Sequence, residues 1–202
     1  MNKKYFSIAS KSEGIYKEKG SKFIAFAYPV ETEEDIKIEL DLLKKEYFDA
    51  RHICYAYRLG ENGEKFRAND DGEPNHSAGT PILNQLKSLE LSDVLVAVVR
   101  YFGGTKLGVS GLITAYKLST QEALKQAVVV EKIPTTKIEI TFEYADLNEA
   151  MKLVKKYDGK ILNQTYDNSK SSIELQIPSE FNTILKNDIV QLSHLGVRID
   201  II

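Results

Sequence analysis

Residues 94–112 read VLVAVVRYFGGTKLGVSGL, and this stretch decides the fold of the part of the chain around it. Its beginning, Val94–Tyr101, is an almost continuous apolar run, which is typical of a strand buried on both faces of a sheet. A helical pattern of apolar residues then runs from about Gly111 to Ala127. The sequence therefore predicts a buried strand, a glycine-rich loop and a long helix in direct succession.

The flanking segments add strands and helices to this unit. Hydrophobic periodicity predicts strands at Phe23–Val30 and Ile53–Leu59, helices at Glu33–Phe48 and Thr80–Leu89, and a polar loop at Gly60–Pro74. Thr32 precedes the first of these helices and is a suitable N-cap. This part of the chain is expected to be a mixed α/β domain.

A domain boundary is expected at residues 132–136, where the helical pattern has ended and an alternating pattern begins. The elements predicted after it are a strand at Lys137–Phe142, a helix capped by Asp146, strands at Lys160–Tyr166 and Ser171–Ile177 joined by a turn at Asp167–Ser169, a helix opened by Pro178, and a strand at Val197–Ile202. Their order is βαββαβ, the ferredoxin-like arrangement. The sequence thus predicts an α+β protein of two domains, residues 1–134 and 135–202.

The composition excludes several classes of protein. Of the 202 residues, 43% are hydrophobic and 28% are charged, as in a globular protein rather than a disordered or collagen-like one. The longest apolar run, Val94–Val99, is far shorter than the ~20 residues that span a bilayer, so we expect no membrane partner and a cytoplasmic location. Cys54 is the single cysteine, which excludes an intrachain disulfide and a cysteine-rich zinc site. The net charge of −2 excludes a uniformly basic nucleic-acid coat but allows a local basic patch.

The glycine-rich segment Arg100–Gly111 has the properties of an anion site. It lies between a strand and a helix start, where backbone N–H groups and the helix dipole favour negative charge. Its glycines permit close approach to a phosphate, and its polar side chains supply donors. The candidate residues are Arg100, Tyr101, Gly103, Gly104, Thr105, Lys106, Gly108, Ser110 and Gly111. The spacing matches neither the nucleoside-triphosphatase loop nor the dinucleotide-binding loop, and the glycines alternatively serve only a tight turn and close helix packing.

A second polar segment, Asn69–Pro81, concentrates acidic groups. Its candidate residues for a second site are Asp70, Asp71, Glu73 and His76. Their spacing does not fit a calcium loop, and no histidine pair has the helical spacing of a zinc site, so no metal site is predicted. Ordinary turn chemistry also accounts for these residues, with Ser77 or Thr80 as a helix cap.

A third segment places Arg51 and His52 at the start of a strand. Cys54 shares a strand face with His52, which superficially resembles a nucleophile and its base. Free cysteine is, however, among the most buried residue types, and nothing in the sequence indicates an activated thiolate. We therefore expect Cys54 to pack inside the sheet, and we assign no catalytic residue.

Together the three segments resemble the YigZ/IMPACT family. The family's basic-His-x-Cys-x-Ala strand stands here as Arg51–Ala56, and its Asp-Asp-Gly-Glu-Pro loop as Asp70–Pro81. Its Val-Arg-Tyr-Phe-Gly-Gly segment stands as Val99–Leu112, with Ser110 where the family usually has a glycine. The resemblance covers about Lys22–Tyr116.

The resemblance implies a fold and a role. The first domain would resemble domain 2 of ribosomal protein S5, and the second the last, ferredoxin-like domain of elongation factor G. The family's eukaryotic members are translational regulators. We therefore expect a non-enzymatic, RNA- or ribosome-associated protein that regulates translation without a cofactor, with ribosomal or other RNA, or a translation-associated protein, as its partner. Arg51, Arg100 and Lys106 would contact phosphates beside His52, while Tyr101 and Phe102 would stack on bases or fill the core.

Two other functions stay open on the sequence alone. An enzyme could bind a phosphate or nucleotide at the glycine-rich loop and use Asp70, Asp71 and Glu73 for magnesium or as a general base. A protein-interaction module would need the conspicuous motifs only for the stability of its fold. Salt-dependent binding to ribosomes would distinguish RNA binding from a protein-interaction module, because phosphate contacts weaken steeply with salt.

Overall fold

A computed structural model describes residues 4–166 and 170–201 of the chain. These residues divide into two compact units, Lys4–Lys132 and the part from Ile133 onward. The turn expected at Asp167–Ser169 lies outside the described residues. The two units are presented separately below.

The first unit is built on a five-stranded sheet. Its strands, in spatial order, are β2 (Ser12–Glu18), β3 (Ser21–Pro29), β6 (Val94–Tyr101), β4 (His52–Leu59) and β5 (Lys65–Asn69). Every neighbouring pair is antiparallel. The central strand β6 has the bounds that the sequence predicts, and it pairs with β3 on one side and β4 on the other.

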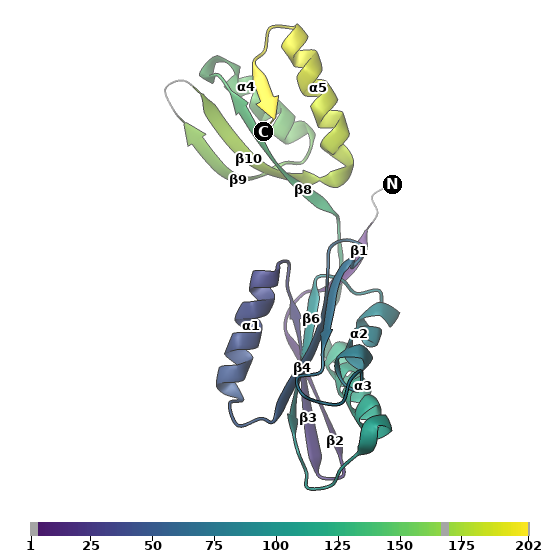
Figure 1. Cartoon of the computed structure of the whole chain (residues 1–202). Coiled ribbons are helices and arrows are strands. Elements are labelled where there is room, and N and C mark those ends of the chain that lie inside the picture. Colours follow the sequence, from purple (N-terminus) through teal and green to yellow (C-terminus); the bar gives the residue numbers. More distant parts are fainter. Residues whose placement is uncertain (1–3, 167–169, 202) are drawn as a thin grey trace. The chain divides into compact units, whose positions relative to one another are not determined.

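Helices cover both faces of this sheet (Figure 1). Helix α1 (Glu33–Glu46) packs on one face, and helices α2 (Gly79–Ser88) and α3 (Gly108–Gln126) pack on the other. Alternate residues of β6 therefore enter two different cores: Val96 and Val98 lie with α2 and α3, while Leu95 and Val99 lie with α1. The continuous apolar run thus reflects two helical layers around an antiparallel central strand.

The start of helix α1 agrees with the sequence prediction, whereas the start of helix α3 does not. Thr32 caps α1 as predicted, and Asp35 completes a reciprocal capping box, because each side chain accepts a hydrogen bond from the other residue's backbone N–H. Helix α3 begins at Gly108 rather than at Gly111. The expected start was late because the first turn of α3 is exposed and carries no inward apolar pattern.

The sequence analysis missed four strands of this unit. The inward residues of β2 include Ser12 and Gly14, which carry no apolar side chain, so this strand shows no apolar alternation. Strand β5 lies inside the segment expected to be a polar loop, and its residues are mostly exposed, so no alternation marks it. Strands β1 (Tyr5–Ile8) and β7 (Val129–Lys132) form a separate antiparallel ribbon. Because each is only 4 residues long, neither gives a period that can be read from the sequence.

The second unit has the element order βαββαβ. Its elements are β8 (Thr135–Phe142), α4 (Leu147–Lys156), β9 (Lys160–Tyr166), β10 (Ser171–Pro178), α5 (Asn182–His194) and β11 (Ile199–Ile201). The strands form an antiparallel sheet in the order β11-β8-β10-β9. Both helices contribute to one core with the inward residues of the sheet, such as Ile140 and Leu175.

Three details of the second unit differ from expectation. Asp146 makes no side-chain cap; its carboxylate instead accepts a hydrogen bond from the backbone N–H of Arg198 at 2.9 Å. Pro178 ends β10, and a 3-10 turn at Ser179–Phe181 precedes α5. The helical spacing of the apolar residues predicts that Ile184 faces inward together with Leu185 and Ile189, but Ile184 is 50% exposed while the other two are buried. None of the helices in residues 4–166 and 170–201 is long and apolar enough to cross a membrane.

A fragment of residues 133–202 is expected to fold alone. Its sheet and its core are formed entirely within the unit, although a unit of this size has little stability to spare. Circular dichroism and dispersed amide signals in proton NMR would confirm this. A random-coil spectrum would show that the unit depends on the rest of the chain.

Candidate anion-binding cleft

A cleft of about 450 Å³ lies where β6 ends and α3 begins. Its lining is cationic on one part and apolar on another. The polar lining residues are Arg51, His52, Glu73, Arg100 and Lys106; the remaining ones are Pro74, Phe102, Leu107, Gly108, Val109 and Leu112. The cleft therefore unites residues from all three conspicuous sequence segments.

Strand pairing brings two of these segments together. In the antiparallel register of β4 and β6, His52 lies directly opposite Arg100. Arg51 stands immediately before β4, so it reaches the same edge of the sheet. Lys106 follows β6 in the loop that leads into α3. Residues about fifty positions apart in the sequence thus meet at one end of the unit.

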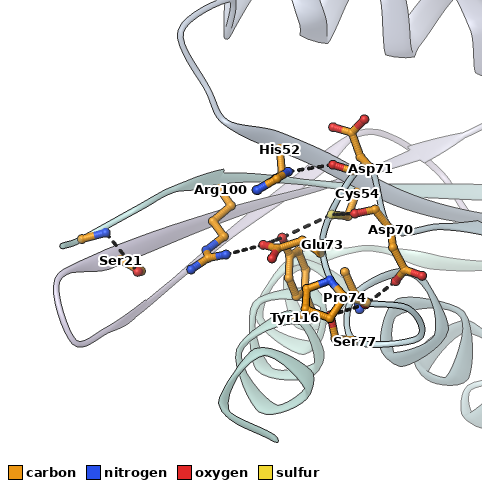
Figure 2. Close-up of polar contacts among 12 residues, drawn as sticks. Ser21, His52, Cys54, Asp70, Asp71, Glu73, Pro74, Ser77, Arg100 and Tyr116 are labelled. Carbon is orange, nitrogen blue, oxygen red and sulfur yellow. Dashed lines mark hydrogen bonds and ion pairs between the residues drawn. The ribbon is translucent and has the colours of Figure 1, made fainter. Parts of the chain in front are cut away.

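Arg100 is held by a buried ion pair with Glu73. The two residues are 6% and 7% exposed, and the guanidinium Nη1 donates to the Glu73 carboxylate (Figure 2). The hydroxyl of Tyr116 on α3 donates to the same carboxylate oxygen at 2.8 Å. A buried carboxylate with two donors is well compensated for the loss of water. The pair therefore joins β6, α3 and the Asp70–Pro81 loop.

The remaining surroundings of Arg100 are aromatic. Its guanidinium carbon lies 5.5 Å from the ring centroid of Phe23 and 5.8 Å from that of Phe102, which is 47% exposed. Its Nε is buried and has no hydrogen-bond partner among the described residues. Cation–π attraction stabilises the charge here without occupying that N–H donor.

Asp70 caps helix α2 from outside the helix. One of its carboxylate oxygens accepts from the backbone N–H groups of Ala78 and Gly79 at 3.0 and 2.8 Å, and the other from that of His76 at 2.9 Å. The cap expected from Ser77 or Thr80 is therefore wrong. Neither side chain can compete, because the carboxylate already takes the first N–H groups of the helix.

Gly79 is needed where the chain passes closest to Asn69. A Cβ at this position would lie 2.5 Å from the backbone nitrogen of Asn69, closer than any side chain tolerates. The loop that Asp70 organises is thus packed tightly against the end of β5. This contact fixes the position of the loop and hence of Glu73.

Asp71 holds the start of β4. Its carboxylate accepts from the backbone N–H of Ile53 at 2.6 Å, and its carbonyl lies 2.7 Å from Nδ1 of His52. That carbonyl can only accept, so Nδ1 carries the proton and Nε2 of His52 is the nitrogen left for other contacts. Asp71 is a positioning residue for His52 rather than a ligand by itself.

The structure brings no metal-binding set together. Asp70 and Asp71 bind backbone N–H groups, Glu73 pairs with Arg100, and Nδ1 of His76 lies 3.1 Å from the Thr80 hydroxyl. Within the part of the chain that the structure describes, no group of three or more His, Cys, Asp or Glu side chains is placed to hold a metal ion. The acidic segment serves the local fold and the cleft wall.

The glycines of the loop have different roles. A Cβ at Gly103 would lie 1.9 Å from the carbonyl carbon of Gly20, and the Gly103 N–H donates to the Ser21 hydroxyl at 3.1 Å. Gly103 thus serves close packing of the loop on the β2–β3 turn. Gly104 and Gly108 have φ values of +86° and +72° with open space beside them, so they serve the turn itself.

The first turn of α3 borders the cleft, and the N-cap residue of the helix makes no side-chain cap among the described residues. Its N-cap residue is Leu107, which has no polar side chain for the first turn. Gly108 and Val109 of this turn line the cleft. A helix start of this kind attracts anions through its N–H groups and its dipole.

Several predicted residues do not line the cleft. Tyr101 packs toward α1, and its hydroxyl donates to Asp49 at 2.7 Å, an interaction that raises the pKa of the hydroxyl to about 12. The others that lie outside the lining are Gly103, Gly104, Thr105, Ser110 and Gly111, together with Asp70, Asp71 and His76. Their positions in the sequence suggested a site, but the lining of the cleft does not include them.

Cys54 is buried and inert. Its thiol is 3.0 Å from the carbonyl oxygen of Asp70 and 3.2 Å from the hydroxyl of Tyr116. Burial raises the pKa of the thiol well above its usual range, so the thiolate is disfavoured. The expectation that Cys54 packs inside the sheet is confirmed.

Tyr116 is the main residue that sequence reasoning missed. It is fully buried and links Glu73 to Cys54. It stands four positions after Leu112, on the inward face of α3. A tyrosine at such a position needs a partner for its hydroxyl, and this signal could have pointed to a polar network.

Comparison with known proteins gives consistent matches. Residues 19–124 match the family described as the Impact N-terminal domain. The IMPACT family member YvyE of Bacillus subtilis is 36% identical over 192 residues, which cover 91% of this chain and 87% of that protein. The IMPACT family member YigZ of Escherichia coli is 35% identical over 150 residues, covering 73% of this chain and 74% of that protein. A crystal structure of a hypothetical protein superimposes with a TM-score of 0.77 at 28% identity and covers 97% of this chain and 96% of that chain.

Removing Glu73 should strongly destabilise the first unit. Glu73→Ala leaves Arg100 buried without its counter-charge, and we expect a loss of about 3–5 kcal/mol in the free energy of unfolding. Urea denaturation measures this. The control is Glu34→Ala, which removes a largely exposed ion pair with Lys37 and should cost about 1 kcal/mol or less. Similar losses in both variants would contradict the structural role of the buried pair.

Replacing the thiol should have a small effect. Cys54→Ala removes a packed side chain, and we expect a loss of roughly 1–2 kcal/mol at most in stability, with ligand binding retained. Thermal unfolding and a binding assay on the same sample test both points. Complete loss of binding in a folded Cys54→Ala protein would mean that the thiol has a functional role.

Proposed function

The chain belongs to the IMPACT family, and on that premise we propose that it is a non-enzymatic protein of translational control that binds RNA at the cleft between β6 and α3. The proposal takes its link with translation from the translational regulators among the family's eukaryotic members. Because translation takes place in the cytoplasm, it also places the protein there.

One observation carries the RNA-binding part of the proposal. Arg51, Arg100 and Lys106 line the same cleft as the N-terminal turn of α3. Most protein contacts to nucleic acids are made to phosphate oxygens, from arginine and lysine side chains and from helix N-termini. The overall charge of −2 does not oppose this, since the attraction is local.

The hydrogen bonds and the ion pair of the carboxylates support a binding role for the cleft rather than a catalytic one. An enzyme that uses Asp70, Asp71 and Glu73 for magnesium or as a general base needs their oxygens directed at a substrate. Here two of them accept backbone hydrogen bonds, and Glu73 is bound to Arg100 and Tyr116. Their contacts serve the shape of the cleft.

The proposal extends to the two units. We infer that the first has the fold of domain 2 of ribosomal protein S5 and that the second is ferredoxin-like, similar to the last domain of elongation factor G. The strand order β11-β8-β10-β9 with two helices on one core supports the second assignment. Because the cleft lies wholly in the first unit, the second would adjust the choice of partner.

Reversing the charge of Lys106 should weaken RNA binding without affecting the fold. Lys106 is exposed, so Lys106→Glu removes a phosphate contact, and the slope of log affinity against log salt should decrease by about one. Filter binding to ribosomal RNA at several salt concentrations measures both effects. Lys117→Glu is the matched control, because Lys117 is also exposed on α3 but does not line the cleft. Equal losses in both variants would contradict binding at the cleft.

A further inference from the structure

We propose that the cleft binds a terminal phosphate monoester together with the nucleoside that carries it, in preference to a phosphodiester within a strand. This inference rests on the proposed function and names the part of the nucleic acid that is recognised. The argument combines the charge of the cleft, the burial of Arg100, and the apolar wall beside it.

The charges in the cleft favour a dianion. Three cationic side chains line it, and Glu73 compensates only Arg100. A phosphate monoester carries a charge of about −1.5 to −2 at neutral pH, because its second pKa is about 6, whereas a phosphodiester carries about −1. The N-terminal turn of α3 adds its partial positive charge at the same place. A monoester therefore gains more from this cleft than a diester.

The position of Arg100 favours an end over a strand interior. Only 6% of Arg100 is exposed to solvent, and its Nε has no hydrogen-bond partner among the described residues. Only a group that enters the cleft can approach this side chain. A terminal phosphate can enter first with its three free oxygens, whereas an internal phosphate is attached to a nucleoside on each side. The strand would have to bend sharply for the diester to reach the same depth.

The apolar lining fits the nucleoside that follows. Phe102, Val109 and Leu112 lie in the same cleft as the cations, and Phe102 is half exposed. A bare inorganic anion would leave this wall in contact with water. Bases stack on exposed aromatic rings, and the volume of about 450 Å³ lies within the ~300–1,000 Å³ usual for small-molecule sites. The cleft is thus suited to one nucleotide rather than to a phosphate alone.

A phosphate monoester attached to a nucleoside occurs both at the end of an RNA and in a free nucleoside monophosphate. The experiment therefore measures both. Fluorescence anisotropy compares short oligoribonucleotides of one sequence, with a label inside the strand, that end in a 5′-phosphate, in a 3′-phosphate or in hydroxyls at both ends. Unlabelled adenosine monophosphate, adenosine and inorganic phosphate then compete with the bound oligonucleotide, and isothermal titration calorimetry measures their direct binding to the protein.

We expect the phosphorylated oligonucleotide to bind roughly tenfold more tightly than the hydroxyl form, because charge-assisted hydrogen bonds are about twice as strong as neutral ones. Lys106→Gln should remove most of this preference, whereas Lys117→Gln should leave it unchanged. Adenosine monophosphate should compete better than either adenosine or inorganic phosphate. Phe102→Leu should reduce the advantage of the monophosphate over inorganic phosphate, which isolates the stacking contribution.

The outcomes separate this inference from the proposed function. Equal affinity for all oligonucleotides, weakened equally by Lys106→Gln, would leave RNA binding at the cleft intact and overturn the preference for an end. Binding of the free monophosphate at the cleft without any RNA binding would support the inference and overturn the proposed RNA function. A preference for phosphorylated ends that survives in Lys106→Gln would place end recognition elsewhere and overturn the inference.

Discussion

The buried ion pair between Arg100 and Glu73 is the interaction on which the end of the first unit that holds the candidate cleft depends. Arg100 is the penultimate residue of the central strand, Glu73 belongs to the acidic loop, and Tyr116 reaches the same carboxylate from α3. A buried charge is tolerated only when it is compensated, so each of these three segments fixes the position of the other two. Arg100 and Glu73 both line the cleft, together with residues of the strand end and the helix start. Figure 2 shows the contacts that hold the pair.

The main elements of the fold could be predicted because their hydrophobic patterns, continuous or periodic, are strong. Val94–Tyr101 has its observed bounds, and the βαββαβ order of the second unit agrees with the pattern of its residues. Strands β2 and β5 and the β1–β7 ribbon could not be predicted, since strands that are exposed, very short or poor in inward apolar residues carry no apolar alternation. Ile184 shows a further limit: helical spacing groups it with Leu185 and Ile189, but those two are buried and Ile184 is not.

The candidate site could be predicted in its residue types but not in its geometry. The sequence pointed to Arg51, His52, Arg100 and Lys106, and the structure gathers them in one cleft. That these residues bind an anion stays a prediction. The use of Asp70 as a cap for a helix eight residues away, and the link through Tyr116, depend on contacts between segments distant in the chain. No local pattern contains such information.

The burial of Arg100 also bears on when water is removed from its charge. Its guanidinium is desolvated as the first unit folds, and Glu73 and the rings of Phe23 and Phe102 orient it from that moment. A long, mobile cation on a surface must instead lose hydration and rotamer freedom each time a partner arrives. The cleft is therefore preorganised: the entropic cost of ordering this side chain belongs to folding, and an arriving anion has only its own hydration shell to lose at that contact.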